Sequence, residues 1–88
     1  MPKRPSDPES NIKSKLGRRI AQLRERIKQP NGRKLSQESL SEMTGYSPEF
    51  IGMVERGINA PSVEGCERIA IALKVDLYEL FVFESLDK

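Results

Sequence analysis

The side chains best suited to chemistry in this 88-residue chain gather within residues 33–59, and their types favour binding over catalysis. Glu49 offers a carboxylate that can accept hydrogen bonds from an amine. Gln37 offers an amide at a predicted helix start, where the helix dipole favours an anion. The chain has no His and a single cysteine, Cys66. It shows no nucleophile–base pair, no Gly-rich phosphate loop and no set of metal ligands. We therefore expect no enzyme activity, no metal, no cofactor and no small-molecule ligand.

Two short predicted helices, over residues 36–44 and 48–55, position these side chains. Ser36 and Ser47 are good N-caps, because a hydroxyl can accept a hydrogen bond from a free amide of the first helical turn. Gly45 lies between the helices, where a residue without a Cβ takes the left-handed conformation cheaply. A helix, a short turn containing Gly and a second helix form the DNA-reading helix-turn-helix unit.

Three further predicted helices supply the core. The first, over residues 14–29, carries an apolar face of residues spaced by 4, 3 and 4: Leu16, Ile20, Leu23 and Ile27. The fourth begins after Ser62 and the fifth covers residues 77–83 after Asp76. Leu40 and Met43 form an apolar stripe on the second helix. We see no segment with strand periodicity, so the predicted fold class is all-α.

Seven motifs, in order along residues 14–83, resemble the Cro/CI-type (XRE) helix-turn-helix family of regulators. They are Leu23-Arg24, Leu35 to Leu40, Gly45 to Ile51, Glu55-Arg56-Gly57, Pro61-Ser62, Ile69 to Leu73 and Leu77 to Phe81. The resemblance implies a compact five-helix, lambda-repressor-like domain that binds double-stranded DNA sequence-specifically, as a transcriptional repressor or controller protein. The chain departs from the family in a longer gap between Arg24 and Gln37.

The resemblance also implies a role for each candidate side chain. The outward-facing residues at the start of helix 48–55 would meet base edges in the major groove: Pro48, Glu49 and Met53. The resemblance assigns phosphate contacts to Gln37, Arg56 and Asn59, and it leaves Ser47 as a further candidate. Two further expectations come from position alone: Arg33 and Lys34 precede the second helix and could reach the same strand, and a half-buried Tyr46 would keep its hydroxyl free for a phosphate. Arg24 and Glu55 are expected to form a structural ion pair. Two alternatives stay open: Glu49 as a first-turn acid that the helix dipole favours, and Ser47 as a cap alone.

Charge divides the chain into two halves. Residues 1–34 hold eleven Lys and Arg against three acidic residues, whereas residues 35–88 hold four against ten. A basic half suggests a side that faces phosphates, although a solvated helix face has the same composition. The acidic half keeps one competing function open, an antitoxin or adaptor-type module that binds a protein.

We divide the chain into a mobile N-terminal arm over residues 1–11, a DNA-binding domain over 12–83 and a short C-terminal tail over 84–88. The last helix holds more apolar groups than one face can bury, so we expect a homodimer interface at Leu80, Phe81 and Phe83, extended by Leu86, and a palindromic operator. The expected compartment is the cytoplasm, with no membrane association. The operator sequence, and the choice between a restriction–modification, toxin–antitoxin or prophage system, stay open.

Overall fold

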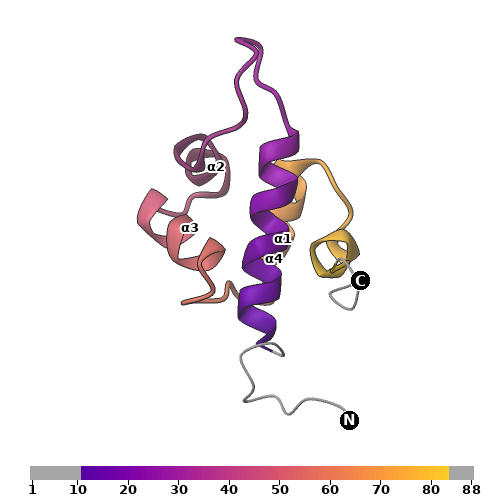
Figure 1. Cartoon of the computed structure of the whole chain (residues 1–88). Helices are drawn as coiled ribbons and strands as arrows, with labels where there is room; N and C mark the ends of the chain where they lie inside the picture. Colours follow the sequence, from indigo (N-terminus) through magenta and orange to yellow (C-terminus); the bar gives the residue numbers. More distant parts are fainter. Residues whose placement is uncertain (1–10, 84–88) are drawn as a thin grey trace.

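A computed structural model of the chain describes residues 11–83, which form four α-helices and a short 3-10 helix (Figure 1). The elements are α1 (Ile12–Arg26), α2 (Gln37–Thr44), α3 (Pro48–Glu55), α4 (Val63–Leu73) and the 3-10 helix η2 (Leu77–Phe81). No helix among these residues is both long enough and apolar enough to cross a membrane. The predicted arm up to residue 10 and the predicted tail, which includes Leu86, lie outside the described residues.

Helix α1 begins and ends earlier than the predicted span of 14–29. Asn11 caps it, because its side-chain oxygen accepts a hydrogen bond of 2.9 Å from the amide of Lys13. Ile27 already has extended backbone angles, and it belongs to the next element. The predicted apolar face is otherwise confirmed, since Leu16, Ile20 and Leu23 are buried and Ile27 packs against them.

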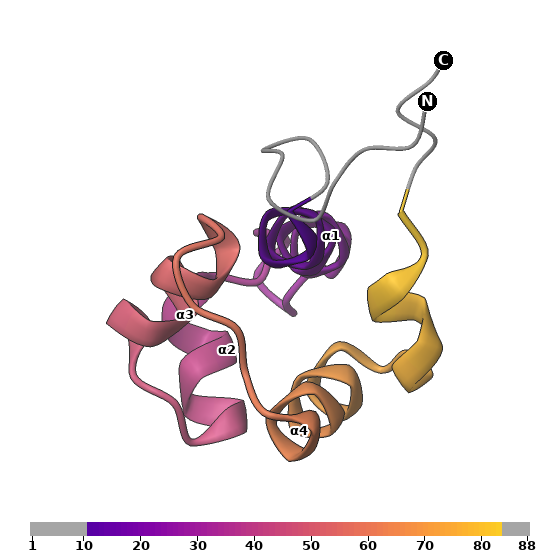
Figure 2. The same ribbon diagram turned by 90° about the horizontal axis from the view of Figure 1, so that it is seen from below.

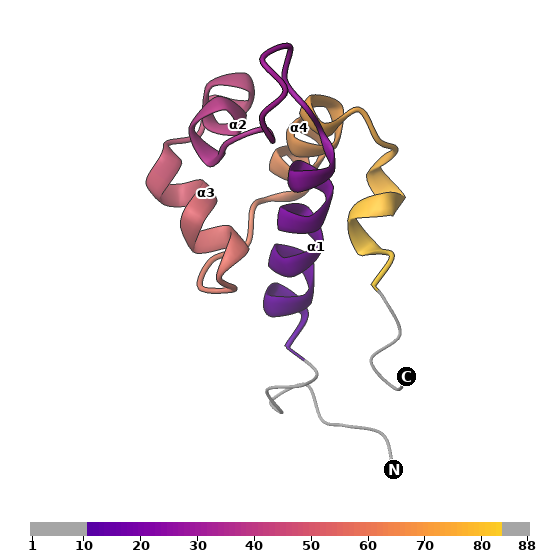
Figure 3. The ribbon, with the colours of Figure 1, turned by 45° about the horizontal axis from the view of Figure 1, so that its top comes forward.

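Residues 27–35 form a small antiparallel hairpin, which we call the hairpin throughout. Its two arms are joined by hydrogen bonds from Gln29 N to the carbonyl of Arg33 (2.8 Å) and from Leu35 N to the carbonyl of Ile27 (2.9 Å). An isolated β-bridge pairs Lys28 with Lys34. Figures 1 and 3 show the hairpin standing beyond the end of α1, beside α2. The hairpin contains this single bridge and no strand, so the predicted all-α fold class is confirmed for residues 11–83.

The pair α2 and α3 has the predicted boundaries and caps. The hydroxyl of Ser36 accepts from Ser39 N at 3.0 Å, and that of Ser47 accepts from Phe50 N at 3.1 Å. Gly45 ends α2 with φ of 83°, a conformation that strains residues with a Cβ. The prediction that Met43 shares a buried apolar stripe with Leu40 is wrong. Met43 is 52% exposed over an open hollow between α2 and α4.

The C-terminal segment corrects the five-helix prediction. The predicted helix over 77–83 is the five-residue 3-10 helix η2, whose tighter winding suits a short segment between two extended residues. Leu80 from η2 is fully buried in the core. Arg19 of α1 fixes the position of η2, since its Nε donates a 2.8 Å hydrogen bond to the carbonyl of Glu79.

Each helical element contributes to one core. Figure 2 looks along α1, with α2 and α3 on one side, η2 on the other and α4 opposite. The largest fully buried side chains are Ile20, Leu40, Ile51, Val54, Ile69 and Leu80. Cys66 is also buried, as expected for a small apolar residue, and burial raises the pKa of its thiol. The core therefore holds α3 rigidly against α1.

Gly17 sets the closest approach between α1 and α3. A Cβ at this position would overlap the carbonyl oxygen of Val54 and lie 2.9 Å from that of Glu55. The two helices can pack at this separation only because position 17 has no side chain.

We predict that Gly17→Ala destabilises the fold by roughly 1–3 kcal/mol, because the added methyl overpacks this contact. Gly→Ala in an unhindered helix interior would instead stabilise by about 0.5–1 kcal/mol, so the sign of the change is diagnostic. Urea unfolding measures it, with Arg18→Ala as an exposed neighbouring control. A stabilised Gly17→Ala variant would contradict the packing described here.

Candidate nucleic-acid interface

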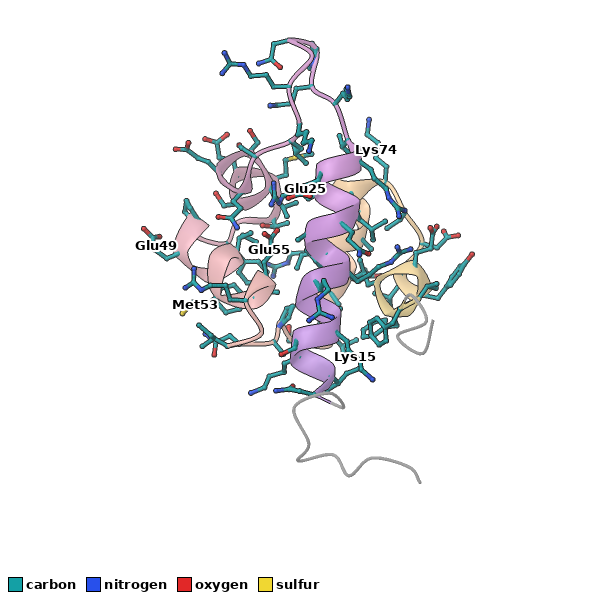
Figure 4. The ribbon with its side chains drawn as sticks, viewed as in Figure 1. Lys15, Glu25, Glu49, Met53, Glu55 and Lys74 are labelled. Atoms are coloured by element: carbon teal, nitrogen blue, oxygen red, sulfur yellow. The ribbon has the colours of Figure 1, made fainter. Side chains whose placement is uncertain are left out.

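A shallow hollow on the surface brings together residues from the start of α2 and from α3. It is lined by Gln37, Pro48, Glu49, Gly52, Met53 and Arg56. Figure 4 shows Glu49 and Met53 on the side of α3 that faces away from α1. All three residues predicted to meet base edges, and two of those predicted to bind phosphate, therefore lie on one surface.

The floor of this hollow is glycine. Gly52 is buried, because the side chains of Arg56 and Gln37 cover it. Pro48 and Glu49 are exposed and Met53 is half-buried. Sequence reasoning missed the burial of Gly52, although glycine inside a short helix is a signal for close approach.

Met53 is connected to the loop that follows α3. The amide Nδ2 of Asn59 lies 3.6 Å from the sulfur of Met53, and the backbone N–H of Asn59 donates to the Met53 carbonyl at 3.4 Å. Asn59 is therefore beside a predicted base-reading residue.

An ion pair between Arg24 and Glu55 joins α1 to α3 beneath the hollow. Nε of Arg24 donates to Oε2 of Glu55 at 2.7 Å, and Nη2 donates to Oε1 at 3.0 Å. The two side chains are only 11% and 6% exposed. Nη1 of Arg24 also donates to the carbonyl of Leu35 at 2.8 Å, where the hairpin ends. A weaker contact of 3.7 Å joins Arg24 to the exposed Glu25.

Gln37 extends this network to α2. Its Nε2 donates a 2.8 Å hydrogen bond to Oε1 of Glu55. An amide nitrogen carries two hydrogens, so one remains for a second acceptor. The side chain therefore lies between the ion pair and the hollow.

Tyr46 packs between α3 and α4. Its ring packs on Phe50, with centroids 4.6 Å apart, and the guanidinium of Arg68 lies 5.8 Å from the ring centroid. The hydroxyl lies against Gly65 of α4, where an added Cβ would overlap it. Tyr46 is half-buried as predicted, and its hydroxyl packs on α4.

The other residues predicted to contact phosphate lie at the surface. Arg33 and Lys34 are exposed on the hairpin, Arg56 is exposed after α3, and Ser47 is exposed at the N-cap of α3. Of the predicted dimer residues, Leu80 is fully buried within its own chain, which corrects its assignment. Phe81 is 43% exposed and its ring lies 6.4 Å, edge to face, from that of the half-buried Phe83.

Comparison with protein families finds a match to the helix-turn-helix family HTH_3 over residues 20–80. Comparison with curated protein sequences finds no match. Among solved structures, the restriction–modification controller protein C.AhdI from Aeromonas hydrophila is similar, with 35% identity and a TM-score of 0.68 over 78% of this chain and 96% of that one.

Two more solved structures share the fold. An HTH_3-family transcriptional regulator from Vibrio cholerae has 27% identity and a TM-score of 0.67, over 80% of this chain and 36% of that protein. The hypothetical transcription factor NHTF from Neisseria has 25% identity and a TM-score of 0.71, over 94% of this chain and 87% of that one. The present chain thus spans about a third of the Vibrio protein and nearly all of the controller protein.

We predict that Arg24→Ala lowers the free energy of unfolding by about 3–5 kcal/mol, because it leaves the buried carboxylate of Glu55 without its cation. Arg26→Ala is the matched control, since Arg26 is exposed in the same helix turn and surface substitutions change stability by about 0.5 kcal/mol or less. Thermal unfolding measures both. Unchanged stability of Arg24→Ala, together with lost DNA binding, would contradict a structural role.

Proposed function

The chain belongs to the helix-turn-helix family HTH_3 of DNA-binding transcriptional regulators, and we propose that it reads the major groove of duplex DNA with the N-terminal end of α3. The observation that carries the proposal is the hollow itself. It combines two exposed residues of the first turn of α3, Pro48 and Glu49, with Met53 and with the polar groups of Gln37 and Arg56. In a helix-turn-helix this end of the second helix meets base edges.

The base-reading set that we propose is unusual in its chemistry. It contains none of the Arg, Asn or Gln side chains that make bidentate contacts with guanine or adenine. The carboxylate of Glu49 can accept a hydrogen bond from N4 of cytosine, while it repels acceptor groups of other bases. Pro48 and Met53 present apolar surface that suits thymine methyl groups. We infer that specificity depends partly on rejecting wrong bases.

Affinity in this proposal comes from phosphates on either side of the groove. Gln37 lies in the first turn of α2, where the second hydrogen of its amide and the helix dipole suit an anion. Arg56 and Asn59 follow α3, and Ser47 precedes it. Since Ser47 already accepts a hydrogen bond from Phe50 N, its hydroxyl hydrogen is the group left for phosphate.

We further propose a homodimer on a palindromic operator, assembled through the exposed apolar residues of η2 and its C-terminal continuation. These are Leu77, Tyr78, Phe81 and Val82. Two-fold symmetry would place the recognition helices about 34 Å apart, on successive turns of the major groove. The proposed activity is regulatory rather than catalytic, it is exerted in the cytoplasm, and the likeness to C.AhdI favours a controller protein.

We predict that Glu49→Gln changes which base is preferred at one operator position. Gln37→Ala should instead weaken binding to all sequences about equally, because phosphate contacts carry no base information. Selecting bound duplexes from a random pool with each variant measures both effects. Identical base preferences for wild type and Glu49→Gln would assign Glu49 to helix capping. A wild type that enriches no duplex would overturn the proposed function.

The dimer prediction concerns Phe81→Asp. We expect this change to convert a dimer to a monomer in sedimentation at micromolar concentration, and to weaken operator binding, because it places a charge in the apolar interface. Val63→Asp is the control, since Val63 is 76% exposed on α4 and an acid suits the first turn of a helix. A monomeric wild type at that concentration would exclude this assembly.

A further inference from the structure

The hairpin is the feature of this molecule that the helix-turn-helix does not explain. We propose that it is a phosphate-binding arm, in which Lys28 and Lys34 together hold a backbone phosphate beyond the segment that α3 reads. The proposal rests on the proposed function, and it extends the contact with duplex DNA to a second element.

The pairing of the hairpin brings two positive charges together. Lys28 and Lys34 are partners in the antiparallel bridge, and the hydrogen bonds flank them rather than joining them. In such a pair the two Cα atoms lie about 4.5 Å apart and both side chains project from the same face. Like charges directly opposite each other are unfavourable. An anion between the two ammonium groups would remove this repulsion.

The surrounding charges are also positive. Residues 26–37 include four cations, Arg26, Lys28, Arg33 and Lys34, and no acid. All four are exposed, and no ion pair within residues 11–83 involves Lys28, Arg33 or Lys34. The nearest acids in sequence are Glu25, which contacts Arg24, and Glu38 in the first turn of α2. Phosphate is the partner that this charge distribution fits.

Side-chain hydrogen bonds fix the position of the hairpin relative to α1 and α2. Nε2 of Gln29 donates to the carbonyl of Lys34 at 3.1 Å, and the hydroxyl of Ser39 in α2 lies 3.3 Å from Oε1 of Gln29. Arg24 binds the Leu35 carbonyl at the hairpin's end. These hydrogen bonds fix the element to α1 and to the first turn of α2, and Figures 1 and 3 show it between the end of α1 and the start of α2.

This attachment determines which phosphates the arm can reach. Lys34 precedes Gln37 by three residues, so its Cα lies at most about 11 Å from that of Gln37. If the first turn of α2 faces one phosphate, the lysine pair reaches a neighbouring phosphate on the same strand, on the side away from α3. The arm therefore adds affinity without reading bases, and it lengthens the bound segment of DNA.

The test compares Lys28→Gln/Lys34→Gln with Lys13→Gln/Lys15→Gln, which removes the same charge from the first turn of α1, at the end of α1 away from the hairpin. The probes are a duplex selected by the wild type, about three helical turns long, and the same duplex trimmed at its flanks. Affinity is measured over a range of salt concentrations, and base preference, sedimentation mass and unfolding temperature are measured for each variant.

We expect the hairpin variant to lose roughly ten-fold or more in affinity for the long duplex at 0.1 M salt, and its salt slope to fall by about 1–2. Trimming the flanks should weaken the wild type and leave the hairpin variant unchanged. The base preference and mass should stay the same, and the unfolding temperature should not fall, because a repulsive pair has been removed.

Several results would contradict the proposal that the hairpin binds phosphate. These are an unchanged salt slope, an equal loss in the Lys13/Lys15 control, a changed base preference, or a changed mass that indicates a protein interface. Wild-type binding with an unaffected hairpin variant would contradict this inference alone. A wild type that binds no duplex would remove the proposed function and this inference together.

Discussion

The buried ion pair between Arg24 and Glu55 is the interaction on which the arrangement of this molecule depends. Arg24 uses all three guanidinium nitrogens, two on Glu55 and one on the carbonyl that ends the hairpin. Glu55 in turn accepts from Gln37 at the start of α2. One charged contact therefore sets the relative positions of α1, the hairpin, α2 and α3. Because the partners are almost fully buried, neither can be removed without leaving the other uncompensated.

Local sequence signals predicted the bounds of α2 and α3 correctly. The wrong predictions, for the end of α1 and for Leu80, depend on contacts between residues far apart in the chain. Ser36, Gly45 and Ser47 act within one helical turn, so the bounds of α2 and α3 follow from sequence alone. Ile27 fits helical spacing, but its carbonyl pairs with Leu35 eight residues away, and this contact ends α1 early. Leu80 belongs to a run of consecutive apolar residues, so its spacing does not show which of them faces the core. Its burial depends on how η2 packs against the other helices.

The same distinction applies to the candidate site. That Pro48, Glu49 and Met53 would share a surface followed from helical spacing, because Ile51 and Val54 face the core. The contacts of Gln37 with Glu55 and of Tyr46 with Gly65 join separate helices, and they could not be read from either helix alone. In the proposed complex, different elements supply specificity and affinity. An acidic recognition helix discriminates between bases, and the basic groups around it, including the hairpin, supply affinity.

Methylation interference with dimethyl sulfate shows whether α3 reads the major groove. This reagent modifies N7 of guanine in the major groove and N3 of adenine in the minor groove, so a single experiment probes both sides of the duplex. On a duplex selected by the wild-type protein, we expect N7 methylation within each half-site to block binding and N3 methylation there to leave it unchanged, because α3 would occupy the major groove. Interference confined to adenine N3, or absent from both grooves, would contradict it.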